Sequence, residues 1–276
     1  MLCLPPNHGR EAHGRRNGVR MSSRSLIGVV TIAGLLALWA VLTMVTGTID
    51  TLRFPSPMQF WQSAKQIATA GYADGTLLSH ALHSLKLVVM GFVVAAAVGI
   101  PLGLLMGWSY RAEALINPIF LLIRPIPPLA WIPLAILWLG LGDAAKIMVI
   151  FFAAFVPSVI NTFTGVRGIE PHVIEAARML GTKRLRLAVE VLVPAAAPMI
   201  FTGLRLSLQA SWTTLVAAEL VGALAGLGRV LNVAQQDIYP AMVMVGMAAV
   251  GALGWGTTRV LAAVEARAMP WLAVRA

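Results

Sequence analysis

Long apolar stretches with few or no charged side chains are the feature that most constrains this chain. A helix needs about 20 consecutive apolar residues to cross the hydrocarbon core of a bilayer. Only helices and closed barrels satisfy their backbone polar groups there. Six stretches of suitable length lie at about 26–47, 85–108, 115–139, 145–166, 199–221 and 240–261. We therefore predict an all-α, polytopic membrane protein with six transmembrane helices.

The composition argues against a soluble domain. Of the 276 residues, 58% are hydrophobic and 12% are charged, which leaves too little polar surface to face water. The net charge of +10 could indicate nucleic-acid binding, but in a membrane chain basic residues more often mark cytoplasmic loops. We therefore expect no nucleic-acid partner. Cys3 is the single cysteine, so neither an internal disulfide nor a cysteine-based metal site is expected.

Lys and Arg residues are distributed unevenly between the two sides of the predicted spans. With the N-terminus inside, fourteen of them are cytoplasmic and five are outside. Cytoplasmic loops carry the excess of positive charge, so both termini are predicted to be cytoplasmic. Residues 1–25 are polar and Arg-rich and are expected to form a disordered basic tail, followed by the six-helix domain at 26–276. Translation could start at Met1 or at Met21.

Two short patterns predict local structure. Ser56 followed by Pro57 is a favourable helix start, and the apolar positions that follow predict a short interfacial helix before the second span. Within that span, Gly99, Gly103 and Gly107 recur every four residues. Small residues at this spacing let two helices approach closely, and we expect tight packing within the subunit rather than a seam between two copies.

The loop at 167–198 carries the clearest functional signal. Pro171 can open a helix, Gly181 suits the left-handed position that ends it, and a second short helix follows. Pro194 and Pro198 are expected to break the chain before the fifth span. The result is a helix-turn-helix on the cytoplasmic surface, rigid enough to receive force from a partner.

Residues of this loop resemble a known motif. Glu175-Ala176-Ala177, a glycine six residues after the glutamate, and the later run from Val191 to Pro194 follow the EAA motif of ABC-importer permeases of the binding-protein-dependent type. The chain departs from the motif by carrying valine at both aliphatic positions, which preserves the hydrophobic contact. The resemblance implies that the ATPase-coupling residues are Glu175, Ala176, Ala177, Arg178, Leu180, Gly181 and Pro194.

Three further segments resemble one branch of that family. Residues 124–133, 137–140 and 214–220 are similar to the permeases that import taurine, aliphatic sulfonates and nitrate, with the taurine permeases most similar. The resemblance covers roughly residues 50–265. It implies a type I ABC importer permease fold in the bacterial cytoplasmic (inner) membrane. It also implies a permease homodimer on an ABC ATPase dimer, supplied by a periplasmic or lipid-anchored substrate-binding protein.

The chain has no phosphate-binding loop of the form G-x-x-x-x-G-K-[ST]. Gly181-Thr182-Lys183 lacks the upstream glycine and lies in the loop discussed above. We therefore predict that this subunit is not an enzyme and holds no cofactor or metal of its own. ATP and Mg would be bound by the partner ATPase.

Arg124 is a candidate pathway residue because a charge inside a span costs roughly 2.5–3.5 kcal/mol and usually faces protein or a cavity. Four prolines follow it within ten residues, at Pro125, Pro127, Pro128 and Pro133. A helix interrupted at membrane depth is tolerated beside a cavity or inside protein. We place Arg124 and Trp131 beside the pathway, where the guanidinium could attract an anion. A structural ion pair or an interfacial arginine is the alternative.

The fifth predicted span contains an unusually polar stripe. Its members are Gln209, Trp212, Thr213, Thr214 and Glu219. A lining of the translocation pathway and interhelical hydrogen bonding use the same residue types, so both interpretations stay open.

A secondary transporter driven by an ion gradient is the competing function. It would favour a longer chain with internal repeats and buried carboxylates, whereas Glu219 is the one acid near the interior of a predicted span. Solute identity stays open in either case, because specificity in importers of this type rests chiefly with the binding protein. Taurine, other sulfonates, nitrate and similar small solutes are all compatible.

Overall fold

The computed structural model describes residues 23–45 and 54–271, which are helical with short connections and contain no named β-strand. The chain divides into two compact units, Met1–Ile49 and Asp50–Ala276. Most of the predicted basic tail, residues 1–22, lies outside the described residues. The tail and the boundary of the transmembrane domain therefore stay predictions.

The first unit contains one helix. Helix α1 (Ser23–Ala40) continues into a π-helical turn at Val41–Val45. Its apolar part, Val30–Met44, is shorter than a full membrane span. The predicted span at 26–47 is thus helical where it is described, and its crossing of the membrane stays a prediction.

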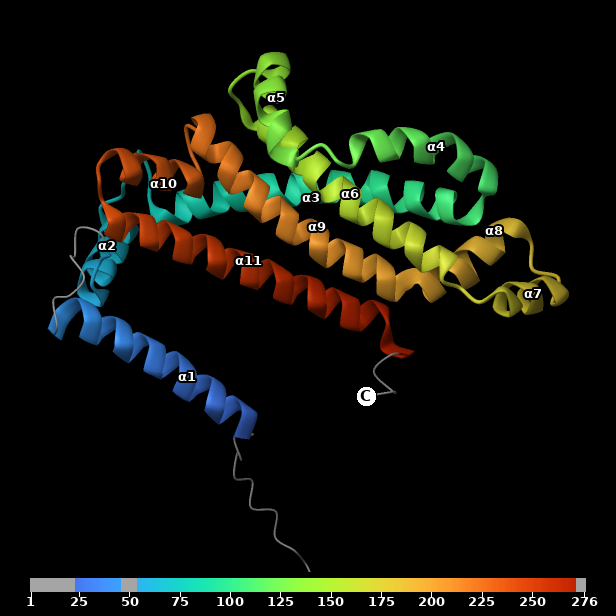
Figure 1. The fold of residues 1–276 in the computed structure, drawn as a ribbon, viewed down its shortest axis with the longest axis horizontal. Coiled ribbons are helices and arrows are strands. Elements are labelled where there is room, and N and C mark those ends of the chain that lie inside the picture. Colours follow the sequence, from blue (N-terminus) through green and yellow to red (C-terminus); the bar gives the residue numbers. More distant parts are fainter. Residues whose placement is uncertain (1–22, 46–53, 272–276) are drawn as a thin grey trace, which may run out of the picture. The chain divides into compact units, whose positions relative to one another are not determined.

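Four long helices build the second unit, and they run along a shared direction in Figure 1. They are α3 (Leu77–Trp108), α6 (Asp143–Arg167), α9 (Val193–Gly222) and α11 (Pro240–Ala268). Each is long and apolar enough to cross a membrane. These helices correspond to the second, fourth, fifth and sixth predicted spans.

The third predicted span is broken rather than continuous. Helix α4 (Tyr110–Ile123) ends just before the proline cluster, and a 3-10 turn (Pro128–Trp131) leads into α5 (Ile132–Leu139) at a bend of 82°. Proline lacks an N–H donor and disfavours the helical conformation of the preceding residue, which accounts for the break. If the bent pair counts as one span, the described residues hold five candidate spans, and otherwise four, against the six predicted.

The glycine series of α3 packs against α6, as predicted. A Cβ atom added at Gly103 would lie 2.7 Å from the Thr162 Cβ and 2.7 Å from the Val159 carbonyl oxygen. Gly99 faces Ser158 and Gly107 faces Val166 in the same way. These contacts lie within one chain, so the glycine spacing serves packing inside the subunit. Beside it, a buried cluster joins α3, α6 and α9 through Leu87, Val88, Ile150, Leu208, Trp212 and Leu215.

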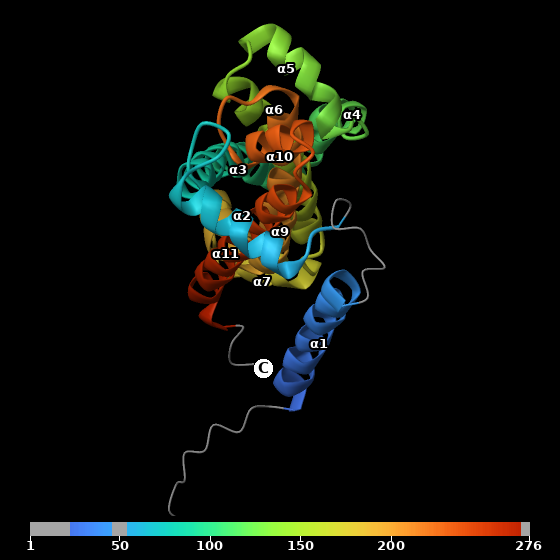
Figure 2. The ribbon, with the colours of Figure 1, turned by 90° about the vertical axis from the view of Figure 1, so that its left-hand side faces the viewer.

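Short helices lie at the two ends of the long ones (Figure 1). At one end are α2 (Pro57–Thr69) and α10 (Leu227–Gln236), and Figure 2 views the unit from this side. The predicted start of α2 is confirmed, because Ser56 and Gln59 form a reciprocal capping box. At the opposite end are α7 (Pro171–Met179) and α8 (Arg184–Leu187).

The two prolines at the end of the long loop do not break the chain, contrary to the prediction. A π-helical segment (Ala188–Leu192) joins α8 to α9 in one continuous helix from Leu185. Pro194 follows closely after the π-helical segment, so it lies inside the continuous helix rather than at its start. Pro198 lies inside the helix, and its carbonyl oxygen accepts a hydrogen bond of 2.9 Å from the Thr202 hydroxyl. The second helix of the predicted helix-turn-helix is therefore an extension of α9.

Candidate functional site

The α7–α8 segment exposes large apolar side chains at one end of the unit. Met179 and Leu180 are 88% and 86% exposed, Leu185 is 77% exposed and Val189 is 60% exposed. We call these four residues the α7–α8 surface. Exposed apolar groups concentrated on one short segment mark an interaction site more often than an ordinary surface.

A left-handed turn fixes the end of α7. Gly181 has φ of +76°, and its N–H donates to the Arg178 carbonyl oxygen at 2.9 Å. The N–H of Thr182 reaches back to the Ala177 carbonyl oxygen at 3.2 Å, which satisfies two carbonyl groups that a helix end otherwise leaves free. The predicted role of Gly181 as a helix terminator is confirmed.

The other predicted coupling residues are divided by their exposure. Glu175, Ala176 and Arg178 are exposed on α7, and Ala177 is half-buried. Pro194 is half-buried in the first turn of α9 and lies away from the exposed tip. Helix α7 thus exposes both charged and apolar side chains.

Arg124 lies at the C-terminal end of α4, directly at the bend before the proline cluster. Its side chain is exposed, and it borders a pocket of about 190 Å³ together with Trp131 and Phe152. The two aromatic rings are stacked, with centroids 4.2 Å apart. Among the described residues Arg124 has no acidic partner within ion-pair distance. The pocket therefore offers an uncommitted guanidinium beside an aromatic wall.

The polar stripe of α9 separates into two faces. Gln209 and Thr213 are exposed, and the Thr213 hydroxyl donates only to carbonyl groups of its own helix. Trp212, Thr214 and Glu219 are buried. The Trp212 indole donates to the Thr257 hydroxyl of α11 at 3.0 Å. The first pair is thus available to a pathway or partner, while Trp212 and Glu219 make contacts between elements.

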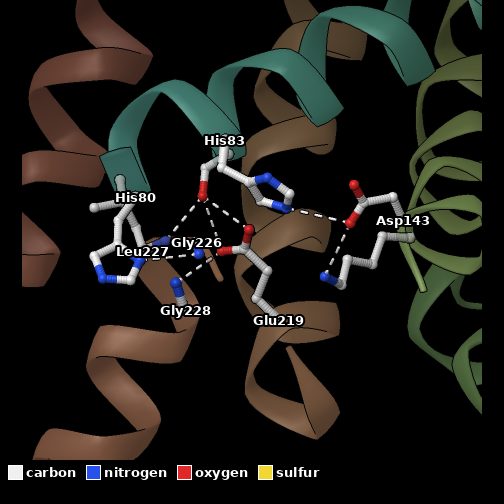
Figure 3. Close-up of polar contacts among 9 residues, drawn as sticks. His80, His83, Asp143, Glu219, Gly226, Leu227 and Gly228 are labelled. Atoms are coloured by element: carbon white, nitrogen blue, oxygen red, sulfur yellow. Dashed lines mark hydrogen bonds and ion pairs between the residues drawn. The ribbon is translucent and has the colours of Figure 1, made fainter. Parts of the chain in front are cut away.

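Glu219 is at the centre of a buried polar cluster at the α10 end of the unit (Figure 3). Its carboxylate accepts hydrogen bonds from the Gly228 N–H at 2.7 Å and from the Ser84 hydroxyl at 2.8 Å. The Ser84 oxygen accepts in turn from the Leu227 N–H at 2.9 Å. Two side chains from two long helices therefore bind the free N–H groups at the start of α10.

His80 completes this cluster in one particular protonation state. Its Nδ1 accepts from the Gly226 N–H at 3.1 Å, and its Nε2 lies 3.1 Å from the Tyr72 carbonyl oxygen. A backbone N–H can only donate and a carbonyl oxygen can only accept, so the ring carries its proton on Nε2 alone. The His80 side chain is buried in the cluster.

A second polar group lies beside the first in Figure 3. Asp143 Oδ1 is 3.2 Å from His83 Nε2 and 3.5 Å from the Lys146 ammonium group. Among the residues that the structure describes, no three His, Cys, Asp or Glu side chains come together so that they could hold a metal ion. The contact between His83 on α3 and Asp143 on α6 links two helices.

Comparison with known proteins identifies the family. Residues 99–268 match the family model described as "Binding-protein-dependent transport system inner membrane component". The chain belongs to this family. It is a multi-pass membrane protein and the permease subunit of an ABC importer.

Individual relatives of this permease agree with the family match. It is 35% identical over 262 residues to the taurine transport system permease protein TauC of Escherichia coli, covering 94% of this chain and 95% of the relative. It is 33% identical over 244 residues to the protein SsuC of Bacillus subtilis, named for transport of aliphatic sulfonates, covering 88% and 87%. It is 32% identical over 257 residues to the bicarbonate transport system permease protein CmpB of Synechococcus elongatus, covering 87% and 91%.

Sequence reasoning missed most of the cluster around Glu219 in this permease. It singled out Glu219 as the acid near a span interior, but it did not connect it with Ser84, His80 or the start of α10. The carboxylate and Ser84 are 135 positions apart in the chain. The one available signal was a buried acid without an obvious partner, which requires hydrogen-bond donors from elsewhere.

Proposed function

We propose that two copies of this permease form the pathway of an ATP-driven importer for a small solute that carries an anionic group. Taurine, a related sulfonate, nitrate or bicarbonate would be delivered by a substrate-binding protein. The three relatives named above carry taurine, sulfonates and bicarbonate in their names. An ATPase dimer with ATP and Mg supplies the energy, and both chain termini are cytoplasmic.

The observation that carries the proposal is the α7–α8 surface. A subunit without a phosphate-binding loop is not expected to hydrolyse ATP itself. It therefore has to be moved by a partner ATPase that binds a rigid element on its surface. Helix α7 ends in a tight turn at Gly181, and the next helix runs without a break from Leu185 into α9, so the short turn connects α7 to a long helix. Glu175 and Leu180 are exposed for contact with the ATPase.

The pathway is proposed to run along the exposed face of α9. Gln209 and Thr213 would be costly against lipid, and a second copy or a water-filled passage would accommodate them. Arg124 would contribute a positive charge beside the Trp131 wall, which suits a sulfonate or bicarbonate group. These assignments support a solute that carries an anionic group.

The test of ATPase coupling compares two exposed leucines at opposite ends of the unit. Leu180→Ser alters the α7–α8 surface, and Leu224→Ser is the matched control, because the two side chains are 86% and 81% exposed. Each variant is co-expressed with the candidate ATPase, and co-purification and ATP-driven uptake into proteoliposomes are measured. We expect Leu180→Ser and Glu175→Gln to lower both readouts by about tenfold or more, since anchor residues contribute about 2 kcal/mol. Leu224→Ser should leave both readouts unchanged. Normal assembly and uptake in Leu180→Ser and Glu175→Gln would rule out this docking site.

The test of the anion contact uses Arg124. Arg124→Gln removes the charge and Arg124→Lys retains it without the planar fork of donors. We expect solute-stimulated ATPase activity to fall in both variants, more strongly for glutamine, while basal ATPase activity is retained. Unchanged stimulation in both would show that Arg124 does not contact the solute.

A further inference from the structure

A large pocket lies between the end of α3 and the α7–α8 segment. Its volume is about 900 Å³, and Trp108, the last residue of the second predicted span, lines it. The lining residues are Leu105, Trp108, Ser109, Tyr110, Arg111, Arg178, Thr182 and Leu187. We call it the elbow pocket, because α3 turns into α4 at Ser109.

Two arginine side chains line the elbow pocket. Arg111 comes from α4 and Arg178 from α7, and none of the lining residues is acidic. Glu113, one turn from this lining, is engaged in an ion pair with Arg167. Among the described residues, neither lining arginine has an acidic partner within ion-pair distance. Two guanidinium groups from separate elements form a favourable site for a phosphate group.

The aromatic residues of the pocket place it at the depth of lipid headgroups. The apolar run of α3 ends at Trp108, which is 39% exposed, and Tyr110 follows at 80% exposed. Tryptophan and tyrosine are enriched where hydrocarbon meets the polar headgroups. The phosphate would therefore lie where phospholipids carry theirs.

An exposed apolar stripe leads from this pocket along α3. Its members are Met90, Val94, Val98, Pro101 and Leu105, and Leu105 also lines the pocket. Successive members are three or four residues apart, which keeps them on one side of the helix. At 1.5 Å per residue, the stripe extends about 22 Å. One leaflet of a core about 30 Å thick is about 15 Å deep, so the stripe is long enough to contact an acyl chain through the whole leaflet.

We propose that the elbow pocket binds the phosphate of an anionic phospholipid whose acyl chain lies along the α3 stripe. The two arginines match the phosphate, the tryptophan and tyrosine match the headgroup region, and the apolar stripe matches an acyl chain. A free phosphate has no apolar part that could contact the α3 stripe. A protein segment could bind the pocket without contacting the stripe. The choice of the inner leaflet rests on the proposed function, because it follows from a cytoplasmic α7. Lipid bound there touches both α3 and the ATPase-coupling helix, so it would stabilise their relative position.

The experiment measures lipid retention by the full-length permease without any ATPase. Delipidated protein in detergent is titrated with phosphatidylglycerol or phosphatidylcholine of the same acyl chains, and bound lipid is counted by native mass spectrometry. We expect the wild type to prefer phosphatidylglycerol. Arg111→Gln and Arg178→Gln should each weaken that preference about fivefold, and the double variant more strongly. Arg267→Gln is the matched control, since it removes an exposed arginine at the end of α11.

The possible outcomes separate this proposal from its rivals and from the proposed function. Unchanged phosphatidylglycerol retention in the double variant would overturn it. So would displacement of the lipid by millimolar inorganic phosphate, which would indicate a site for a soluble anion. Loss of the lipid from the wild type when the ATPase is added would assign the pocket to the protein partner. Because binding is measured on the permease alone, failure of ATPase coupling would leave the expected result unchanged.

Discussion

At the scale of single residues, Ser84 has the most demanding position. Its hydroxyl donates to Glu219 and accepts from the Leu227 N–H, both inside the protein. Ser84→Ala removes both bonds and leaves a buried carboxylate and a buried N–H with fewer partners. We expect a loss of about 1–3 kcal/mol in stability, because an unsatisfied buried group costs this much. Thermal unfolding in detergent measures it, with Thr258→Ala as control, whose exposed hydroxyl bonds only within α11. Equal midpoints for the two variants would contradict this role.

At the scale of secondary-structure elements, the α3–α6 contact depends on glycine. Gly103→Ala places a methyl group against the Val159 backbone, which cannot rotate away as a side chain could. We expect it to separate the helices and to destabilise the permease by about 1–3 kcal/mol, as overpacking generally does. Gly251→Ala is the control, since that α11 position has open space around it and alanine favours a helix. If Gly103→Ala melts at or above the control, the close approach carries no weight.

At the scale of the whole molecule, exposed residues of the second unit divide into those that face lipid and those that face water or a second copy. In a variant without Cys3, Thr213→Cys should react with a small membrane-impermeant thiol reagent in the assembled importer, because α9 lines the proposed pathway. Val98→Cys, also exposed but on the α3 stripe, should stay unlabelled within lipid. Mass spectrometry of the labelled protein measures both. Equal labelling of the two positions would remove the argument for a pathway along α9.

Local patterns predicted local structure well. The start of α2 at Ser56 and the end of α7 near Gly181 each depend on residues within a few positions of one another. Hydrogen bonding and backbone conformation over one helical turn decide such features. The effect of proline was harder to predict from the sequence. Prolines interrupt the helix at the α4–α5 bend, whereas Pro194 and Pro198 are accommodated within α9. Whether a proline breaks the helix depends on the tertiary contacts around its ring, which local sequence patterns do not predict.

The sequence by itself determined the membrane class, four of the long helices and the permease family, because hydropathy and motif spacing are properties of contiguous residues. Only the tertiary structure decided which half of the α9 stripe is exposed and which is buried. It alone brought Glu219 and Ser84 to the start of α10, and Arg111 and Arg178 to one pocket. These residues are far apart in the chain. Their proximity is determined by the packing of whole helices, which depends on buried area and shape.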